Sequence, residues 1–153
     1  MVSLALLVLA IEASAPFDGF FKSRMHPDYG RPIVSAVLSA DFNGDGFEDH
    51  AALYWYEGPS GQPAPIEYPS FFVAWLGKSH GDFWKTGPHP IGEVGHWFPD
   101  RLEFHEGIVV VSGAQWGPED QPCCPTREES SEYEFHPGPR FGFRVGRKLL
   151  GQR

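Results

Sequence analysis

Glycine and proline interrupt this sequence at short intervals, which limits the length of any helix or strand that it can form. The chain has 18 glycines and 15 prolines in 153 residues, where average usage would give about 11 and about 8. Glycine weakens a regular element through its backbone entropy, and proline lacks an N–H group to donate. The segments between them are rich in aromatic and β-branched residues, which favours strands. We therefore expect a mostly β fold, a single small antiparallel β domain arranged as a sheet or sandwich, with little helix beyond an N-terminal leader at residues 1–15.

The apolar runs between these breaks predict the first strands. Ile33–Ala40 and His50–Tyr56 flank an aspartate-rich loop, and Ser70–Leu76 lies beyond a stretch with four prolines. Phe83–Lys85 is a short fourth candidate. The only candidate helix outside the leader lies near Phe17–Met25, because no other segment keeps apolar residues at helical spacing over eleven or more positions.

Two hairpins are expected in the second half of the chain. Leu102–Phe104 and Ile108–Ser112 are separated by three residues, with Gly107 in the turn. Ser131–Phe135 and Phe141–Val145 alternate polar and aromatic side chains on either side of a Pro-Gly-Pro turn. Such alternation places every second side chain on one face, so these strands are expected to share one core.

The first fifteen residues have the pattern of a signal peptide. An apolar run from Leu4 to Ile11 is followed by Ala13-Ser14-Ala15, the small-residue pattern that precedes signal-peptidase cleavage. We expect a signal peptide over residues 1–15, a β-rich domain over residues 16–153, and an extracellular or periplasmic location. The apolar run is shorter than the about 20 residues that span a bilayer, so no stable membrane insertion is expected. The alternatives are a wrongly chosen start codon and a plain buried first strand, because no Lys or Arg precedes the run and Glu12 lies near its end.

One loop carries oxygen-bearing side chains at regular intervals. The sequence DFNGDGFED places Asp41, Asn43, Asp45 and Asp49 at loop positions 1, 3, 5 and 9. Calcium takes about six to eight oxygen ligands, and a tight loop supplies them from alternate side chains and from the carbonyl at position 7, here that of Phe47. The three aspartates within these nine residues would repel one another without a cation. The alternative is a tight hairpin turn in which the aspartates accept hydrogen bonds from backbone amides.

The same loop resembles that of FG-GAP/VCBS-type repeats, the D-x-N-G-D-G-x-x-D stretch of integrin-like propellers. The resemblance covers Val37–Leu53, and it implies that calcium is bound by the five residues named above. An EF-hand would need a glutamate at position 12 and helical flanks, whereas position 12 is Ala52. Because the loop occurs once and a propeller needs several blades, the propeller itself is not implied.

Small exported bacterial proteins of the LppP/LprE lipoprotein family are similar in the order of three features. These are the strand, calcium loop and strand unit at Asp41–Asp49, a Cys-Cys-Pro stretch at Cys123-Cys124-Pro125, and a final β-hairpin at Tyr133–Val145. The cysteine that accepts a lipid in such proteins is missing after the leader. This family implies no known catalytic activity.

The two cysteines, Cys123 and Cys124, are neighbours in the sequence. In an exported chain they allow one intramolecular bridge. Neighbouring Cα atoms are about 3.8 Å apart, below the usual disulfide range of about 4.4–6.8 Å, so such a ring is expected to be reducible. Two buried thiols, or pairing with another chain, are the alternatives. With Pro122 and Pro125 on either side, the loop Trp116–Glu128 is expected to present a rigid contact surface.

Charge and motif content narrow the classes of partner and reaction. The net charge is −8, and no basic run precedes the C-terminal tail, so we do not expect this protein to bind nucleic acid. No nucleophile elbow, phosphate-binding glycine loop or acid–base carboxylate pair occurs. The histidines lack the spacing of a zinc site, and His80, His89 and His96 are the least implausible ligands for zinc or copper.

Partners are expected to be a protein or a carbohydrate, because aromatic rings can stack on sugars. Trp55 and Trp75 lie within expected strands, whereas Trp84, Trp97 and Trp116 lie near glycine or proline and are expected to be more exposed. The sequence predicts an exported, calcium-stabilised β-domain of structural or interaction type. A carbohydrate-binding module, and after it a metal-dependent hydrolase, are the alternatives.

Overall fold

The computed structural model describes residues 17–24, 26–58, 70–92, 97–121 and 123–136, and the backbone of residues 146–152. The leader at residues 1–15 and the expected strand Phe141–Val145 lie outside these ranges. The described elements are α1 (Phe17–Lys22), β1 (Pro32–Ala40), β2 (Asp49–Tyr56), β3 (Ser70–Gly77), the 3₁₀ turn η1 (Ser79–Gly81), β4 (Phe83–Ile91), β5 (Trp97–His105), β6 (Ile108–Gln115), β7 (Arg127–Glu134) and β8 (Gly146–Gln152). The predicted mostly β, antiparallel domain is therefore confirmed.

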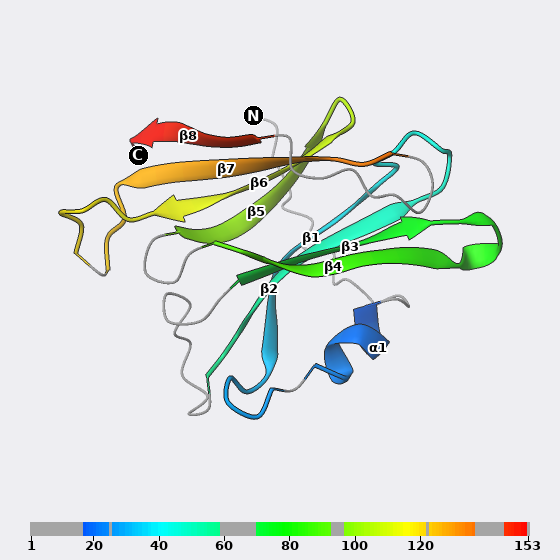
Figure 1. Cartoon of the computed structure of the whole chain (residues 1–153), viewed down its shortest axis with the longest axis horizontal. Coiled ribbons are helices and arrows are strands. Elements are labelled where there is room, and N and C mark those ends of the chain that lie inside the picture. The colour runs from blue at the N-terminus through cyan, green and yellow to red at the C-terminus, as the bar shows by residue number, and fades with distance from the viewer. Residues whose placement is uncertain are drawn as a thin grey trace, which may run out of the picture.

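Two antiparallel sheets form the domain, with strand orders β1-β2-β3-β4 and β5-β6-β7-β8 (Figure 1). Side chains from both sheets share one core, in which Leu53 and Phe72 of the first sheet meet Val109 and Val111 of the second. The rings of Phe72 and Tyr133 stack across it with centroids 4.7 Å apart. This is sheet-on-sheet packing, in which the inner faces bury the apolar half of each alternating strand.

A second cluster covers the outer face of the first sheet. Short helix α1 lies against this face (Figure 1), where Phe17 meets Trp75 edge-to-face at 4.8 Å and Phe21 meets Tyr54 at 5.3 Å. Strand β2 is consequently buried on both faces, with Ala52 in this cluster and Leu53 in the inter-sheet core. Burial on both faces explains why β2 and β3 are nearly continuous apolar runs in the sequence.

The predicted strands of the first sheet match in position, and the largest difference is the length of β4. This strand runs to Ile91, well beyond the short candidate that begins at Phe83–Lys85, and carries Pro88 and Pro90. Because β4 is at the edge of the sheet, a proline there can leave its missing N–H on the unpaired side. Helix α1 is shorter than the expected span and ends at Lys22.

In the second sheet the strands are longer than predicted. Strand β5 begins at Trp97 and continues through a bulge between Pro99 and Arg101, and β7 begins at Arg127. The predicted hairpin turn at Gly107 is present, where φ is +84°. Strand β8 was not predicted, because its residues read as a basic tail, and it pairs with β7 along the sheet. Among the described residues, no helix has the length and apolar character needed to cross a lipid bilayer.

Candidate functional site

The β1–β2 loop is closed by hydrogen bonds from its own side chains. Asp41 accepts the backbone N–H of Asp45 on Oδ1 at 3.1 Å and that of Gly46 on Oδ2 at 2.8 Å. The amide of Asn43 donates to Asp45 Oδ2 at 3.0 Å, and Asp45 Oδ1 accepts the N–H of Phe47 at 2.9 Å. Positions 1, 3 and 5 are therefore connected to one another within a single turn of the chain, where all three side chains remain half-buried.

Asp49, at loop position 9, is the buried member of the set. Its side chain is fully buried, Oδ2 accepts the N–H of Phe42 and Oδ1 accepts that of Gly77, both at 2.7 Å. Burial raises the pKa of Asp49 above its ordinary value of 3.8, and the carboxylates of Asp45 and Asp41 add to this, whereas the two N–H groups oppose it. The carboxylate joins the start of the loop to the end of β3, residues that are far apart in sequence.

Phe42 anchors the loop in the inter-sheet core. Only 1% of its surface is exposed, and its ring centroid lies 5.5 Å from that of Phe104 and 5.7 Å from that of Phe135. At the other end, a Cβ on Gly77 would collide with the carbonyl oxygen of Glu48. The loop thus lies directly on the end of β3, and an oxygen-rich turn is held on a rigid base.

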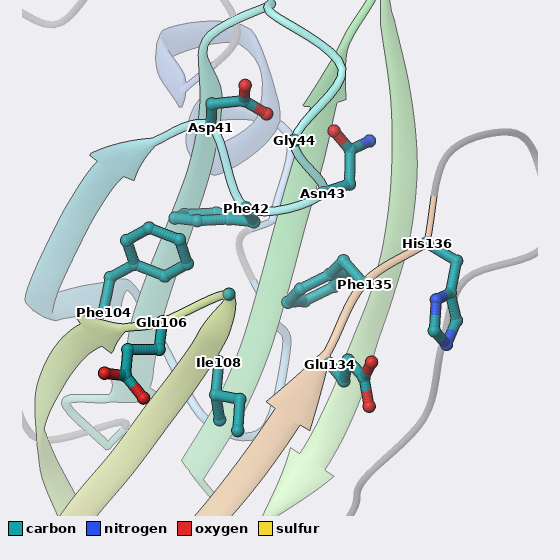
Figure 2. A pocket seen from close by; sticks show the side chains of 11 residues that line it. Asp41, Phe42, Asn43, Gly44, Phe104, Glu106, Ile108, Glu134, Phe135 and His136 are labelled. Atoms are coloured by element: carbon teal, nitrogen blue, oxygen red, sulfur yellow. The ribbon is translucent and has the colours of Figure 1, made fainter.

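A hollow of about 500 Å³ lies beside this loop, at one end of the two sheets. Figure 2 shows the rings of Phe42, Phe104 and Phe135 grouped next to the start of the loop. The polar groups on its walls come from the β1–β2 loop, the β5–β6 turn and the end of β7; they are Asp41, Asn43, Glu106, Glu134 and His136. A volume of this size is within the range of small-molecule sites.

The five calcium ligands expected from the sequence lie in one loop, and their role stays a prediction. Asp41, Asn43 and Asp45 are brought together through hydrogen bonds, Phe47 is 41% exposed at the loop surface, and Asp49 faces the protein interior. In the described part of the chain, no group of three or more His, Cys, Asp or Glu side chains comes together to hold a metal. Asn43 and a backbone carbonyl are outside that set of residue types.

The described histidines and tryptophans that were considered as site residues lie outside the β1–β2 loop, and they differ in how exposed they are. His80 is exposed on η1, and His89 lies on β4 with its Nε2 2.7 Å from the hydroxyl of Thr86, while His96 lies outside the described residues. Burial lowers the pKa of His89. Trp97 is only 5% exposed in the inter-sheet core, so the expectation of its exposure was wrong. Trp75, expected within a strand, is buried as well.

Sequence reasoning missed the anchoring role of Phe42 and the pocket. An aromatic residue at the second position of an otherwise polar loop was the available signal for the anchor, since a large apolar side chain in a turn tends to be buried against something. The pocket combines three segments distant in sequence, so no local pattern could reveal it.

A disulfide joins Cys123 and Cys124, which confirms the predicted neighbouring pair. Both residues are exposed, so the alternative of two buried thiols was wrong. The surrounding loop is shorter than expected, because β7 already begins at Arg127.

Comparison of this chain with protein-family models, with curated proteins and with solved structures finds no match.

Proposed function

We propose that this protein is an exported, calcium-stabilised β-domain of structural or interaction type, with Asp41, Asn43, Asp45, the Phe47 carbonyl and Asp49 as the calcium site. The observation that carries the proposal is the contrast within one loop between a fixed base and an oxygen-rich tip. Phe42 and Asp49 are buried at the base, while the oxygens at positions 1, 3 and 5 are gathered at the half-exposed tip.

Such a loop suits a hard cation for two reasons. Its donors are carboxylate, amide and carbonyl oxygens, the ligands that calcium prefers. Since each oxygen has two lone pairs, hydrogen bonds to backbone amides leave acceptor capacity on Asp41 and Asp45. A cation at the tip would also offset the repulsion between neighbouring carboxylates, which the loop must otherwise tolerate.

Export supports the same proposal from the sequence side. Extracellular calcium sites work with weak affinities, about 10⁻⁴–10⁻³ M, and a single loop with a prearranged base is adequate for that range. No group in the proposal acts as a base on water, so the role of the ion would be to hold β1, β2 and β3 together at one end of the sheet.

The first experiment is thermal unfolding in millimolar calcium and in chelator. With a dissociation constant of about 10⁻⁴–10⁻³ M, calcium at about 10 mM is in ten- to hundredfold excess and adds about 1.4–2.7 kcal/mol of stability, so the melting temperature should rise in calcium. Asp45→Ala should abolish the calcium-dependent rise. The matched control is Asp82→Ala, which removes an exposed carboxylate from another loop and should leave the rise intact.

Measuring each variant with and without calcium separates the ion from the hydrogen bonds that Asp45 itself makes. A wild-type melting temperature that does not move between calcium and chelator would refute the proposed site. An equal rise in Asp45→Ala and wild type would show that any bound calcium lies elsewhere.

A carbohydrate-binding module is the second candidate, and the pocket beside the loop favours it. Sugars present apolar faces to aromatic rings and hydroxyl groups to carboxylates and amides. The pocket has carboxylates and an amide on its walls, and the half-buried Phe104 is its accessible ring, because Phe42 and Phe135 are buried. Because its rings are phenylalanines, tryptophan emission would be a poor reporter of binding there.

Backbone NMR with a panel of oligosaccharides tests this candidate directly. Binding should shift the amide signals of the pocket residues, and Glu134→Ala should weaken it. Glu119→Ala, an exposed glutamate on the β6–β7 loop, is the control. If no oligosaccharide in a broad panel shifts the pocket signals, the carbohydrate candidate fails while the calcium proposal is unaffected.

A further inference from the structure

The Cys123–Cys124 disulfide lies at the outer part of the β6–β7 loop, away from the proposed calcium loop. Both cysteines are exposed, so a reductant in solution can approach either sulfur without opening the core. Solvent access is one of the main conditions for thiol–disulfide exchange.

The rest of this loop is held by bonds that do not involve the cysteines. Asp120 Oδ2 accepts the backbone N–H of Gly117 at 2.6 Å and that of Thr126 at 2.9 Å, and the hydroxyl of Thr126 donates to Oδ1 at 2.9 Å. These hydrogen bonds lower the pKa of Asp120, so the carboxylate stays charged as an acceptor.

The loop is also fixed at its base by strand pairing. Gln115, the last residue of β6, pairs with Arg127, the first residue of β7. Within the loop, the N–H of Cys124 donates to the carbonyl of Gln121 at 2.9 Å, which closes a turn around Cys123. Opening the disulfide would therefore leave the loop ends and the hydrogen bonds of Asp120 in place, because neither involves a cysteine.

A bridge between neighbours also contributes little to the stability of the fold. The entropic stabilisation by a disulfide grows with the length of chain that it closes, and the sequence separation here is one residue. The bond therefore restricts the unfolded chain very little, and the folded domain should keep its stability when the two cysteines are reduced.

We propose that Cys123–Cys124 is a surface thiol–disulfide exchange site that is reduced by dithiols while the domain stays folded. A thiolate of the dithiol attacks one Sγ, forms a mixed disulfide and releases the other cysteine as a thiolate, which takes up a proton. The second thiol of the reductant then displaces the first cysteine. The reductant leaves as a cyclic disulfide, and the protein has gained two electrons and two protons as two thiols.

The adjacency of the cysteines selects dithiols over monothiols. After attack by a monothiol, the released cysteine stays next to the mixed disulfide, so closure of the ring competes with attack by a second monothiol. A dithiol escapes this reversal, since its own second thiol completes the reaction within the same complex. The reduced pair then offers two neighbouring thiols, a ligand set for thiophilic reagents such as a trivalent arsenical.

The test uses the intact oxidised protein under native conditions. It is treated with dithiothreitol or with 2-mercaptoethanol at equal thiol concentration, alkylated, and analysed by intact mass. Dithiothreitol should give two alkyl adducts, with at least about tenfold more reduced protein than the monothiol gives. In a parallel sample that is reduced, freed of dithiothreitol and not alkylated, phenylarsine oxide should block both thiols with a single adduct. Adducts that form only after denaturation, or equal reduction by the two reagents, would overturn the proposal.

Two variants make the result independent of folding artefacts. Cys124→Ser should accumulate a stable mixed disulfide with oxidised monothiol, because no neighbour can expel it, whereas wild type should not. The double variant Cys123→Ser/Cys124→Ser should melt within about 2 °C of the oxidised wild type, since the bridge closes so short a chain. A loss much larger than this would show that the fold depends on the disulfide, and it would refute an exchange site that works in the folded state.

Discussion

Replacing Phe42 with alanine should be one of the most damaging substitutions in the β1–β2 loop. Only 1% of its surface is exposed, and its ring lies between those of Phe104 and Phe135 at centroid distances of 5.5 and 5.7 Å. Phe47 in the same loop provides a matched control, because it is the same residue type at 41% exposure.

The expected magnitudes follow from burial. Removing a fully buried phenylalanine ring costs about 3–5 kcal/mol, because transfer energy is lost and a cavity remains. Two aromatic contacts are lost with it, each worth up to about 1.5 kcal/mol beyond area burial, which places Phe42→Ala in the upper part of that range. Phe47→Ala should cost about 1–2 kcal/mol, since its ring is partly in water and its removal leaves no closed cavity.

Urea unfolding followed by tryptophan emission measures both values, with chelator present so that calcium does not contribute. A small domain has about 5–15 kcal/mol of total stability, so Phe42→Ala can leave too little to measure. Phe42→Leu keeps most of the apolar contact and should lie between wild type and Phe42→Ala. The reasoning is refuted if Phe42→Ala and Phe47→Ala cost the same, because burial would then not distinguish the anchor from the tip.

Three further predictions test other parts of the structure. Asp49→Ala should cost at least about 2 kcal/mol in chelator, because two buried backbone N–H groups lose their acceptor; chemical denaturation measures this, and an unchanged midpoint would contradict the hydrogen bonds described. Gly113→Ala should destabilise the fold by about 1–3 kcal/mol or more, since the added Cβ would collide with the β5 backbone. In the same assay, Gly19→Ala should be neutral or stabilising, because a Cβ at Gly19 meets nothing within 4 Å. The pKa of His89 is lowered from 6.5 in the folded protein, so this residue favours folding fully above pH 6.5 and less as the pH falls below it; melting temperatures from pH 7.5 to 5 should fall less in His89→Gln than in wild type, and equal slopes would exclude this contribution.

The first sheet could be predicted well from the sequence because its strands are enclosed by strong local signals. The run at β2 is apolar and aromatic and ends at Glu57-Gly58, and the structure ends the strand at Tyr56. β4 was predicted too short, since Pro88 and Pro90 normally terminate a strand and only the sheet order reveals that this one is at the edge. The first residues of β7 were not predicted as strand, because they are charged.

The candidate site was predictable in composition but not in arrangement. The alternating oxygen-bearing side chains were visible in the sequence from Asp41 to Asp49, and the structure brings Asp41, Asn43 and Asp45 together through hydrogen bonds. What the sequence could not show is that Asp49 would turn inward to Gly77, because the two residues are 28 positions apart and their meeting depends on the pairing of β2 with β3. The aromatic pocket is formed by three distant segments, so it depends on the packing of both sheets.

The two prolines of β4 also affect how separate molecules meet. Sheet edges with free N–H and C=O groups can recruit a strand from another chain, and this is a common route to aggregation. Pro88 and Pro90 are two residues apart, so their nitrogens lie on the same side of β4, and neither can donate a hydrogen bond. An incoming strand would find consecutive donors missing along the outer side of β4, and this protects the β4 edge of the first sheet against edge-to-edge association when the protein is concentrated.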